Sequence, residues 1–280
     1  MRKIPVCINL DTLALGTEWG LSSSKDPTYK LVDERLVFRL EKLGFKVILF
    51  VVGKDLESSE NRKFVNKWSL AGHLIGNHSY SHPLNLSSLS KEEIETEIGK
   101  TDQLIKEITG RKPRFFNAPG WTASAVIDKT LFQFGYNTDL SPFLSWWIYP
   151  ILLKQWWSLR KSKIASTVWN RKDIFYPLLH KLNTYEKCSK IKKIPLPVVG
   201  FTSIPVWHTG WFVYGASIFI KLLKMAMKSN PEFYYLMHPA DVISRDDIPV
   251  EFSDKVDFER INISLNDKLK YLDLTLELLK

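Results

Sequence analysis

The 280-residue sequence predicts a single α/β domain with a parallel sheet. Short apolar runs rich in β-branched residues alternate with stretches of helical periodicity, and no internal repeat or Gly/Ser-rich linker separates them. The clearest strand is residues 47–53, and helices are expected at residues 30–43 and 92–108. A chain of this length can bury one substantial core, so nothing in it requires two domains.

Polar residues stand at the ends of several predicted strands. Asp11 ends the strand expected at residues 6–11, while Asn117 and His238 stand where two later apolar runs end. In folds that alternate strands with helices, the carboxyl ends of the strands form the functional face. We therefore expect these three side chains to serve one site.

Histidines are concentrated between Ala71 and Pro83, where three of the chain's six are found. His78 and His82 are four residues apart, which predicts one helical turn with both imidazoles facing one point. Neutral imidazole suits zinc and its first-row neighbours. Surface helices also carry histidines at this spacing by chance, so the pair gains weight only from the other strand-end residues.

The order of these motifs resembles the polysaccharide deacetylase family, which is also called the NodB-homology group or carbohydrate esterase family four. The resemblance is dense over residues 4–139 and resumes at residues 194–207 and 234–242. It implies a distorted (β/α) barrel with fewer than eight strands. It also implies metal-dependent hydrolysis of an N-acyl amide on an amino sugar.

Within that family, the sequence looks most like the formamido-arabinose-phosphoundecaprenol deformylases, which act on a sugar attached to a lipid phosphate. Short signatures carry this likeness: Asp11-Thr12, Gly16-Thr17-Glu18, Ala118-Pro-Gly-Trp121 and Tyr136-Asn-Thr-Asp139. The likeness implies an acetyl or formyl group on an undecaprenyl-linked amino sugar, which would feed lipid A or cell-envelope glycan modification. The expected substrate-binding residues are Asn117, Ala118, Pro119, Gly120 and Trp121.

Two other functions stay open. One is a soluble polysaccharide or peptidoglycan deacetylase, and the other is a catalytically silent carbohydrate- or lipid-binding homologue. The first is weakened by the missing export signal: the chain opens Met1-Arg-Lys and reaches Asp11 before any long apolar segment could form. We therefore expect a peripheral protein on the cytoplasmic side of the bacterial inner membrane, and we infer no protein partner.

Hydrolysis of an amide requires an activated water, stabilisation of the oxyanion and an acid for the leaving amine. A divalent metal supplies the first two, because it polarises the carbonyl and lowers the pKa of bound water to about 7. One carboxylate and two imidazoles, from Asp11, His78 and His82, would hold the ion and leave positions open. Zinc is favoured, with Mn, Co or Ni as alternatives. The resemblance makes His238 the general acid; otherwise it would be a capped core histidine at a strand end.

Asn9 stands where the resembled family has an aspartate that acts as general base. Asparagine has no titratable proton and cannot take that role. Asn117 likewise replaces an arginine of the family, although the lipid-linked deformylases lack this arginine too. Three explanations of Asn9 remain: an engineered inactivating substitution, a natural enzyme with another base such as Glu18 or Asp139, or a binding protein without catalysis.

The net charge of +9 comes from one segment. Between Lys154 and Lys193 there are 11 Lys or Arg and two acids, Asp173 and Glu186, which gives an excess of nine positive charges. Five of the 10 tryptophans lie in or just before it. Together these features define an insertion at about residues 140–193.

The uncharged run at residues 140–153 is 14 residues long, which is shorter than the roughly 20 residues that a membrane span needs. Tryptophan prefers the lipid headgroup level, and nearby Lys and Arg attract anionic lipid. We expect the insertion to lie on an anionic membrane surface through Trp146, Trp147, Trp156 and Trp157. Alternatively these aromatics cover the core; nucleic-acid binding is disfavoured because no recognition motif is present. The helix expected at residues 218–228 is either a second interfacial element or an ordinary core-packing helix.

Overall fold

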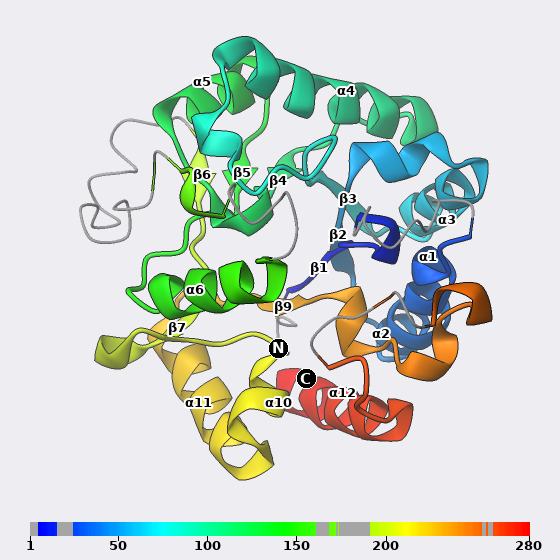
Figure 1. The fold of residues 1–280 in the computed structure, drawn as a ribbon, viewed down its shortest axis with the longest axis vertical. Coiled ribbons are helices and arrows are strands. Elements are labelled where there is room, and N and C mark those ends of the chain that lie inside the picture. Colours follow the sequence, from blue (N-terminus) through cyan, green and yellow to red (C-terminus); the bar gives the residue numbers. More distant parts are fainter. Residues whose placement is uncertain are drawn as a thin grey trace. The chain divides into compact units, whose positions relative to one another are not determined.

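The computed structural model of the chain describes residues 5–15, 25–160, 168–171, 173, 191–253, 256 and 260–280 (Figure 1). The chain forms two compact units. Unit 1 comprises Met1–Val51, Asp55–Ile75 and Val206–Lys280, and unit 2 comprises Val52–Lys54 and Gly76–Pro205.

Seven strands form a sheet in the order β6-β5-β4-β3-β2-β1-β9. The pairs β1/β2, β1/β9, β3/β4, β4/β5 and β5/β6 are all parallel. The predicted α/β class, with fewer than eight parallel strands and intervening helices, is confirmed. The strands are β1 (Val6–Asn9), β2 (Val47–Val51), β3 (Leu74–Asn77), β4 (Phe115–Phe116), β5 (Thr138–Asp139), β6 (Lys192–Lys193) and β9 (Tyr235–Met237). Two further strands, β7 (Val198–Val199) and β8 (Ile204–Pro205), pair with each other in antiparallel fashion.

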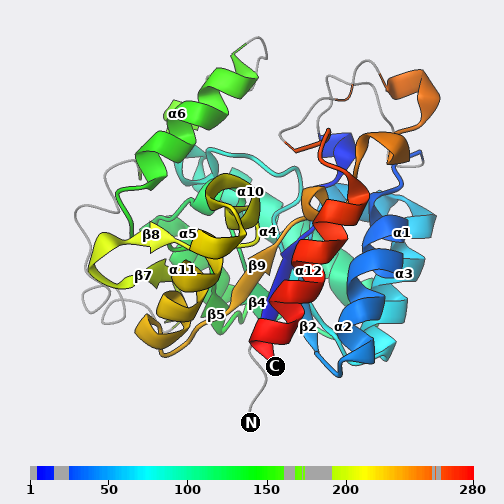
Figure 2. The ribbon, with the colours of Figure 1, turned by 90° about the horizontal axis from the view of Figure 1, so that it is seen from below.

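In unit 1, β1 lies between β2 and β9 and is buried along its whole length. Cys7 lies in this strand, and burial raises the pKa of its thiol. Figure 2 shows α1, α2 and α3 together on one flank, and Arg39 of α2 contacts Asp273 of α12 at 3.7 Å. The helices are α1 (Thr28–Val32), α2 (Phe38–Lys42), α3 (Ser59–Leu70), α10 (Gly210–Tyr214), α11 (Ala216–Ser229) and α12 (Leu265–Leu279), with a π-helical segment (Asp33–Val37) joining α1 to α2.

Helix α11 packs as an ordinary amphipathic helix. Its Phe219 and Leu223 are buried, and Phe219 contacts Trp211 of α10 with ring centroids 4.9 Å apart. Ile218 and Met225 on the same helix are exposed. One face of α11 is therefore in the core of unit 1, as the core-packing alternative expects.

In unit 2, helices α4 (Lys91–Thr109) and α5 (Ala125–Gln133) cover the short strands β4 and β5. The sequence defines both ends of α4, because Ser90 and Glu93 form a capping box and Gly110 ends the helix in the left-handed conformation. This helix confirms the one predicted at residues 92–108. Residues of α4 belong to a buried hydrophobic cluster of unit 2. The cluster consists of Leu86, Ile94, Ile98, Phe116, Ala118, Ile127, Leu131, Tyr136 and Ile191.

The expected insertion is described in part, because residues 161–167, 172 and 174–190 lie outside the described ranges. Its main described element is α6 (Ile148–Leu159). Among the residues that the structure describes, no helix is both long enough and apolar enough to cross a membrane.

Candidate active site

Asn9 and Asp11 come from the end of the buried strand β1 in unit 1. The Asn9 side chain is buried, and its Oδ1 accepts no hydrogen bond from the described residues. Asp11 lies two residues further, past the end of the strand, where its side chain is partly exposed. The position expected to hold the base thus carries a buried amide, and the position expected to hold a metal ligand carries a partly exposed carboxylate.

His238 follows β9, the parallel neighbour of β1, and its Nε2 lies 3.8 Å from Asp11 Oδ2. The backbone N–H of His238 donates to buried Asp241 at 2.8 Å. The buried Lys268 amine donates to the carbonyls of Ala240, at 3.0 Å, and of Ile243. These buried polar groups fix the loop that carries His238, so the structure brings Asp11 and His238 together as predicted.

His208 is another histidine of unit 1, and the sequence did not single it out. It is fully buried, and its Nδ1 lies 3.1 Å from the hydroxyl of Tyr235 on β9. Burial lowers the pKa of His208 to about 4, although the nearby Asp241 carboxylate acts in the opposite direction. At neutral pH this imidazole is therefore uncharged. The sequence signal was weak, because only its place after an apolar run marks it.

His78 and His82 follow β3 in unit 2, but not on a helix. Residues 78–85 form a loop, in which Ser79 and His82 have φ of +63° and +59°. Asn77 Oδ1 accepts the backbone N–H of Ser79, which makes a tight turn, and Glu97 accepts two further backbone N–H groups. The helical-turn prediction was wrong for this reason. The turn nevertheless brings the two imidazole centroids to 5.0 Å.

A backbone carbonyl sets the orientation of the His78 ring. His78 Nδ1 lies 2.5 Å from the carbonyl oxygen of Asn117. A carbonyl oxygen only accepts, so Nδ1 carries the proton and Nε2 carries the lone pair that a metal requires. Metal-binding histidines commonly use such an outer partner, which selects the tautomer.

The predicted substrate loop is buried at its start and accessible at its end. Asn117, Ala118 and Pro119 are buried, and Ala118 N–H donates to Ser141 Oγ at 2.7 Å. Gly120 and Trp121 are partly exposed and have φ of +59° and +55°. Of the five predicted substrate-binding residues, these two are therefore the ones that solvent reaches.

Asp139 has a structural position. It is buried, forms an ion pair with the buried amine of Lys193, and accepts the backbone N–H of Ser141 at 2.8 Å. The ammonium of Lys193 also contacts Asp128, whose pKa rises to about 6 chiefly because of burial. This arrangement disfavours Asp139 as the missing base. Glu18, the other candidate, lies outside the described residues.

The donor set fits a divalent metal. Unit 2 offers the imidazoles of His78 and His82 as donors, and unit 1 offers the carboxylate of Asp11. A carboxylate with two imidazoles is a composition typical of catalytic sites that keep open positions. The Asn117 carbonyl holds the proton on His78 Nδ1, so the lone pair of this ring is on Nε2, which agrees with such a role.

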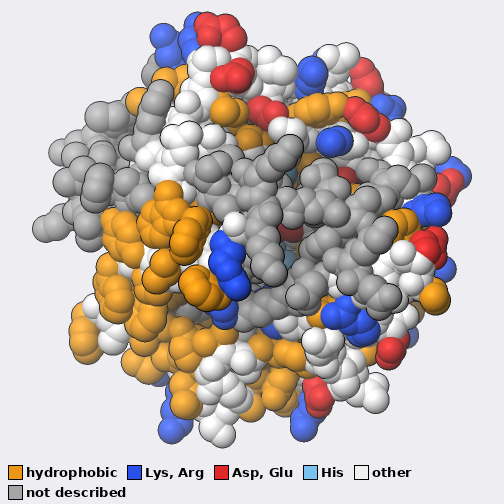
Figure 3. Space-filling model, in the orientation of Figure 1, with side chains coloured by type: hydrophobic (Ala, Val, Ile, Leu, Met, Phe, Trp, Pro, Cys, Tyr) orange, Lys and Arg blue, Asp and Glu red, His pale blue; other side chains and the backbone are white. Residues whose placement is uncertain are grey.

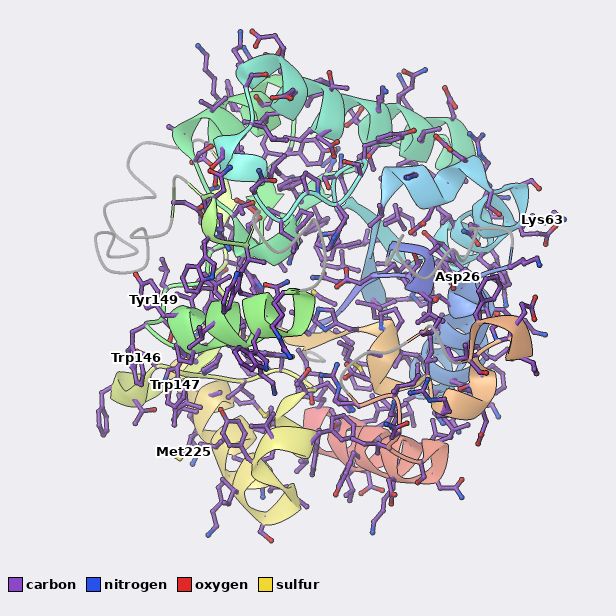
Figure 4. The ribbon with its side chains drawn as sticks, viewed as in Figure 1. Asp26, Lys63, Trp146, Trp147, Tyr149 and Met225 are labelled. Carbon is purple, nitrogen blue, oxygen red and sulfur yellow. The ribbon has the colours of Figure 1, made fainter. Side chains whose placement is uncertain are left out.

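Most of the aromatic residues of the insertion lie on helix α6 or just before it. Trp146 and Trp157 are 50% and 59% exposed, and Figure 4 shows Trp146, Trp147 and Tyr149 near its amino end. Trp147 and Trp156 are partly buried, and the Trp147 indole N–H donates to the Thr202 carbonyl at 3.3 Å. Two of the four tryptophans predicted at the membrane therefore also have packing roles.

Known proteins support a polysaccharide deacetylase relationship for part of the chain. The model of the polysaccharide deacetylase family matches residues 24–138. A peptidoglycan-N-acetylglucosamine deacetylase of Bacillus cereus is 32% identical over 85 residues, which is 30% of either chain. A peptidoglycan deacetylase of Helicobacter pylori is 32% identical over 142 residues, covering 48% of this chain and 47% of the relative.

A solved structure is also similar: a mutant CE4 family pseudoenzyme with restored enzymatic activity shows 18% identity and a TM-score of 0.46, covering 97% of this chain and 64% of that one. The matches span less than half the length of the two curated relatives. The resemblance to the polysaccharide deacetylase family is thus supported over residues 24–138. The narrower likeness to lipid-linked deformylases stays a prediction.

The buried His208 predicts acid sensitivity of the folded state. Its pKa is about 4 when folded and near 6.5 when unfolded, so the unfolded state binds the proton preferentially between these values. This contribution to stability is complete above pH 6.5 and is lost as the pH falls towards 4. The full contribution of His208 to the free energy of unfolding is about 3 kcal/mol. Urea titrations at several pH values should show that the free energy of unfolding of His208→Gln falls less steeply with acid than that of the wild type. An equal fall in both proteins would contradict this account.

Proposed function

We propose that this chain is a metal-dependent amidohydrolase that removes an acetyl or formyl group from the amine of an amino sugar. The observation that carries the proposal is the pair of imidazoles 5.0 Å apart, with His78 held by a backbone carbonyl in the tautomer that metal binding requires. The contact of Asp11 with His238 is the second support. The family match and the names of the curated relatives favour an N-acyl sugar as the substrate.

In this proposal Asp11, His78 and His82 hold one divalent ion, with zinc favoured. The ion would polarise the acyl carbonyl and acidify a bound water. His238, fixed through Asp241, would donate a proton to the nitrogen of the departing amine. Gly120 and Trp121 would contact the sugar, because they are the accessible part of their loop.

We further propose that the sugar is linked to a polyprenyl phosphate and that the protein binds an anionic membrane surface. Figure 3 shows hydrophobic side chains gathered over α6, with Lys or Arg side chains beside them. Exposed Arg160 lies over the Trp157 ring at 4.2 Å, and Phe201, between β7 and β8, is 98% exposed. Aromatic rings next to cations favour the headgroup region of anionic lipid.

A soluble polysaccharide deacetylase is the competing function. The curated relatives support it at least as well, because their names give peptidoglycan as the polymer that they deacetylate. The exposed aromatic side chains of α6 favour the lipid-linked substrate. Mass spectrometry of an N-acyl amino sugar on undecaprenyl phosphate, run beside an N-acetylglucosamine oligomer, separates the two functions. Turnover of the oligomer alone would favour the soluble enzyme.

Removal of one proposed metal ligand should lower metal content. His82→Ala leaves two of three protein ligands, so affinity should fall further than the roughly 10- to 100-fold that loss of an outer partner costs. Elemental analysis after dialysis against a chelator measures the bound zinc. His238→Gln is the matched control, since it should keep the zinc and lose turnover. An unchanged zinc content in His82→Ala would refute the ligand assignment.

Restoring a carboxylate at residue 9 should raise turnover. A general base is typically worth about a hundred- to ten-thousand-fold in rate, and Asn9 can accept no proton. Asn9→Asp should therefore raise kcat with little change in KM. The same assays on Glu18→Gln provide the control. A flat response to Asn9→Asp together with loss of activity in Glu18→Gln would place the base at Glu18, and inactivity of all forms would favour a binding protein.

Membrane binding should depend on the exposed tryptophans and on lipid charge. In flotation assays, vesicles with anionic lipid should carry the protein at low salt and release part of it at high salt. Trp146→Ser with Trp157→Ser should reduce binding, whereas Phe132→Ser, which removes a 49% exposed side chain of α5, should not. Equal binding of all variants to neutral and anionic vesicles would contradict the membrane proposal.

A further inference from the structure

A buried ion pair lies in the basic segment that follows α6. Arg171 and Asp173 have side chains only 3% and 4% exposed. Arg171 Nη2 donates to Asp173 Oδ2 at 2.8 Å, and Arg171 Nε donates to Asp173 Oδ1 at 3.2 Å, so the pair is bidentate. Burying two charges removes their hydration, and their mutual attraction offsets this cost only when further hydrogen bonds satisfy both groups. The other hydrogen bonds of Arg171 and Asp173 therefore identify the segments that the pair holds in place.

The guanidinium of Arg171 binds the accessible end of the substrate loop. Its Nη1 donates to the Gly120 carbonyl at 2.7 Å, and its Nη2 donates to the Trp121 carbonyl at 3.3 Å. Both of these loop residues have a left-handed backbone, which is unfavourable for the tryptophan. A Cβ on Gly120 would lie 3.3 Å from the Leu84 carbonyl oxygen, so this loop is closely packed. Its conformation thus needs support from outside the loop.

The carboxylate of Asp173 joins two segments of unit 2. Its Oδ1 accepts the Ser87 hydroxyl at 2.6 Å, and its Oδ2 accepts the Ala123 N–H at 2.9 Å. Ser87 stands five residues after His82, and Ala123 stands two residues after Trp121. One side chain therefore links the turn after the histidine loop to the end of the substrate loop.

We propose that Arg171 and Asp173 are positioning residues that fix the Gly120–Trp121 loop against the turn following His82. The inference rests on the proposed function, in which this loop contacts the sugar. It gives part of the basic insertion a role in the site that is separate from binding lipid. Loss of the pair should loosen the loop and weaken substrate binding. Metal binding should remain, because neither residue belongs to the donor set.

The test compares Arg171→Ala and Asp173→Asn with Arg111→Gln, which removes an exposed charge of the same unit. Hydrogen exchange in the zinc-loaded protein should be at least about tenfold faster for peptides spanning residues 117–124 in the two site variants. Exchange in α4 and the zinc content should stay at their wild-type values. Added guanidinium should slow the loop exchange of Arg171→Ala and leave Asp173→Asn unaffected. Arg171→Lys should not restore the loop, because an ammonium lacks the planar fork.

Kinetics on the N-acyl amino sugar that the wild type turns over give the second readout. KM should rise about 10- to 100-fold with a smaller change in kcat, since misplaced binding groups mainly cost substrate affinity. Unchanged loop exchange, or an equal increase in α4, would overturn the positioning role. A wild type that turns over no amino sugar would refute the proposed function instead, and the exchange and guanidinium measurements would still decide the role of the pair.

Discussion

Parallel strand pairing is the constraint on which the candidate site depends. In unit 1, Val6 of β1 is level with both Val47 of β2 and Tyr235 of β9. Strands in this register end at the same edge, so the residues that follow β1 and β9 are neighbours there. Asp11 and His238 meet at 3.8 Å for this reason, although 227 residues separate them in the chain.

The same pairing orients the first histidine of unit 2. Asn77 of β3 is level with Phe116 of β4, so the next residues, His78 and Asn117, stand side by side. The backbone N–H of Asn117 donates to the Asn77 carbonyl at 3.1 Å, and the Asn117 carbonyl then accepts from His78. A hydrogen bond that follows from strand register thus sets the tautomer of a histidine that we propose as a metal ligand. Because this contact uses the backbone carbonyl, it does not depend on which side chain stands at position 117.

Buried charges support the loops around these strand ends. Lys193 holds Asp139, Asp139 accepts from Ser141, and Ser141 accepts from the Ala118 N–H. Arg171 and Asp173 hold the next part of the same loop. Three of the charged residues in these networks belong to the segment with the excess of basic residues. That segment therefore contributes to the interior of unit 2 as well as to its surface.

In the proposed function, Asn9 separates the ability to bind from the ability to catalyse. Its amide is isosteric with a carboxylate, so the strand end can keep its shape while losing a proton acceptor. The proposed metal ligands and His238 do not depend on residue 9 for their contacts in the described structure. Binding of an acyl sugar and slow hydrolysis are both compatible with this chemistry, which makes residue 9 the most informative position for mutagenesis.

The sequence by itself determined the fold class and most strand ends, because buried β-branched runs, a capping box and a terminal glycine act locally. It also identified Asp11, His78, His82 and His238 as candidate site residues, because their residue types and order are visible without coordinates. It misassigned the path between His78 and His82, since the Asn77 turn and the Glu97 contacts that replace a helical turn involve a distant helix. Only the tertiary structure revealed the burial of His208, the ion pair of Asp139 and the contacts of Arg171. Each of these depends on which groups meet across long sequence separations, and the pKa or conformation that results is a property of that environment.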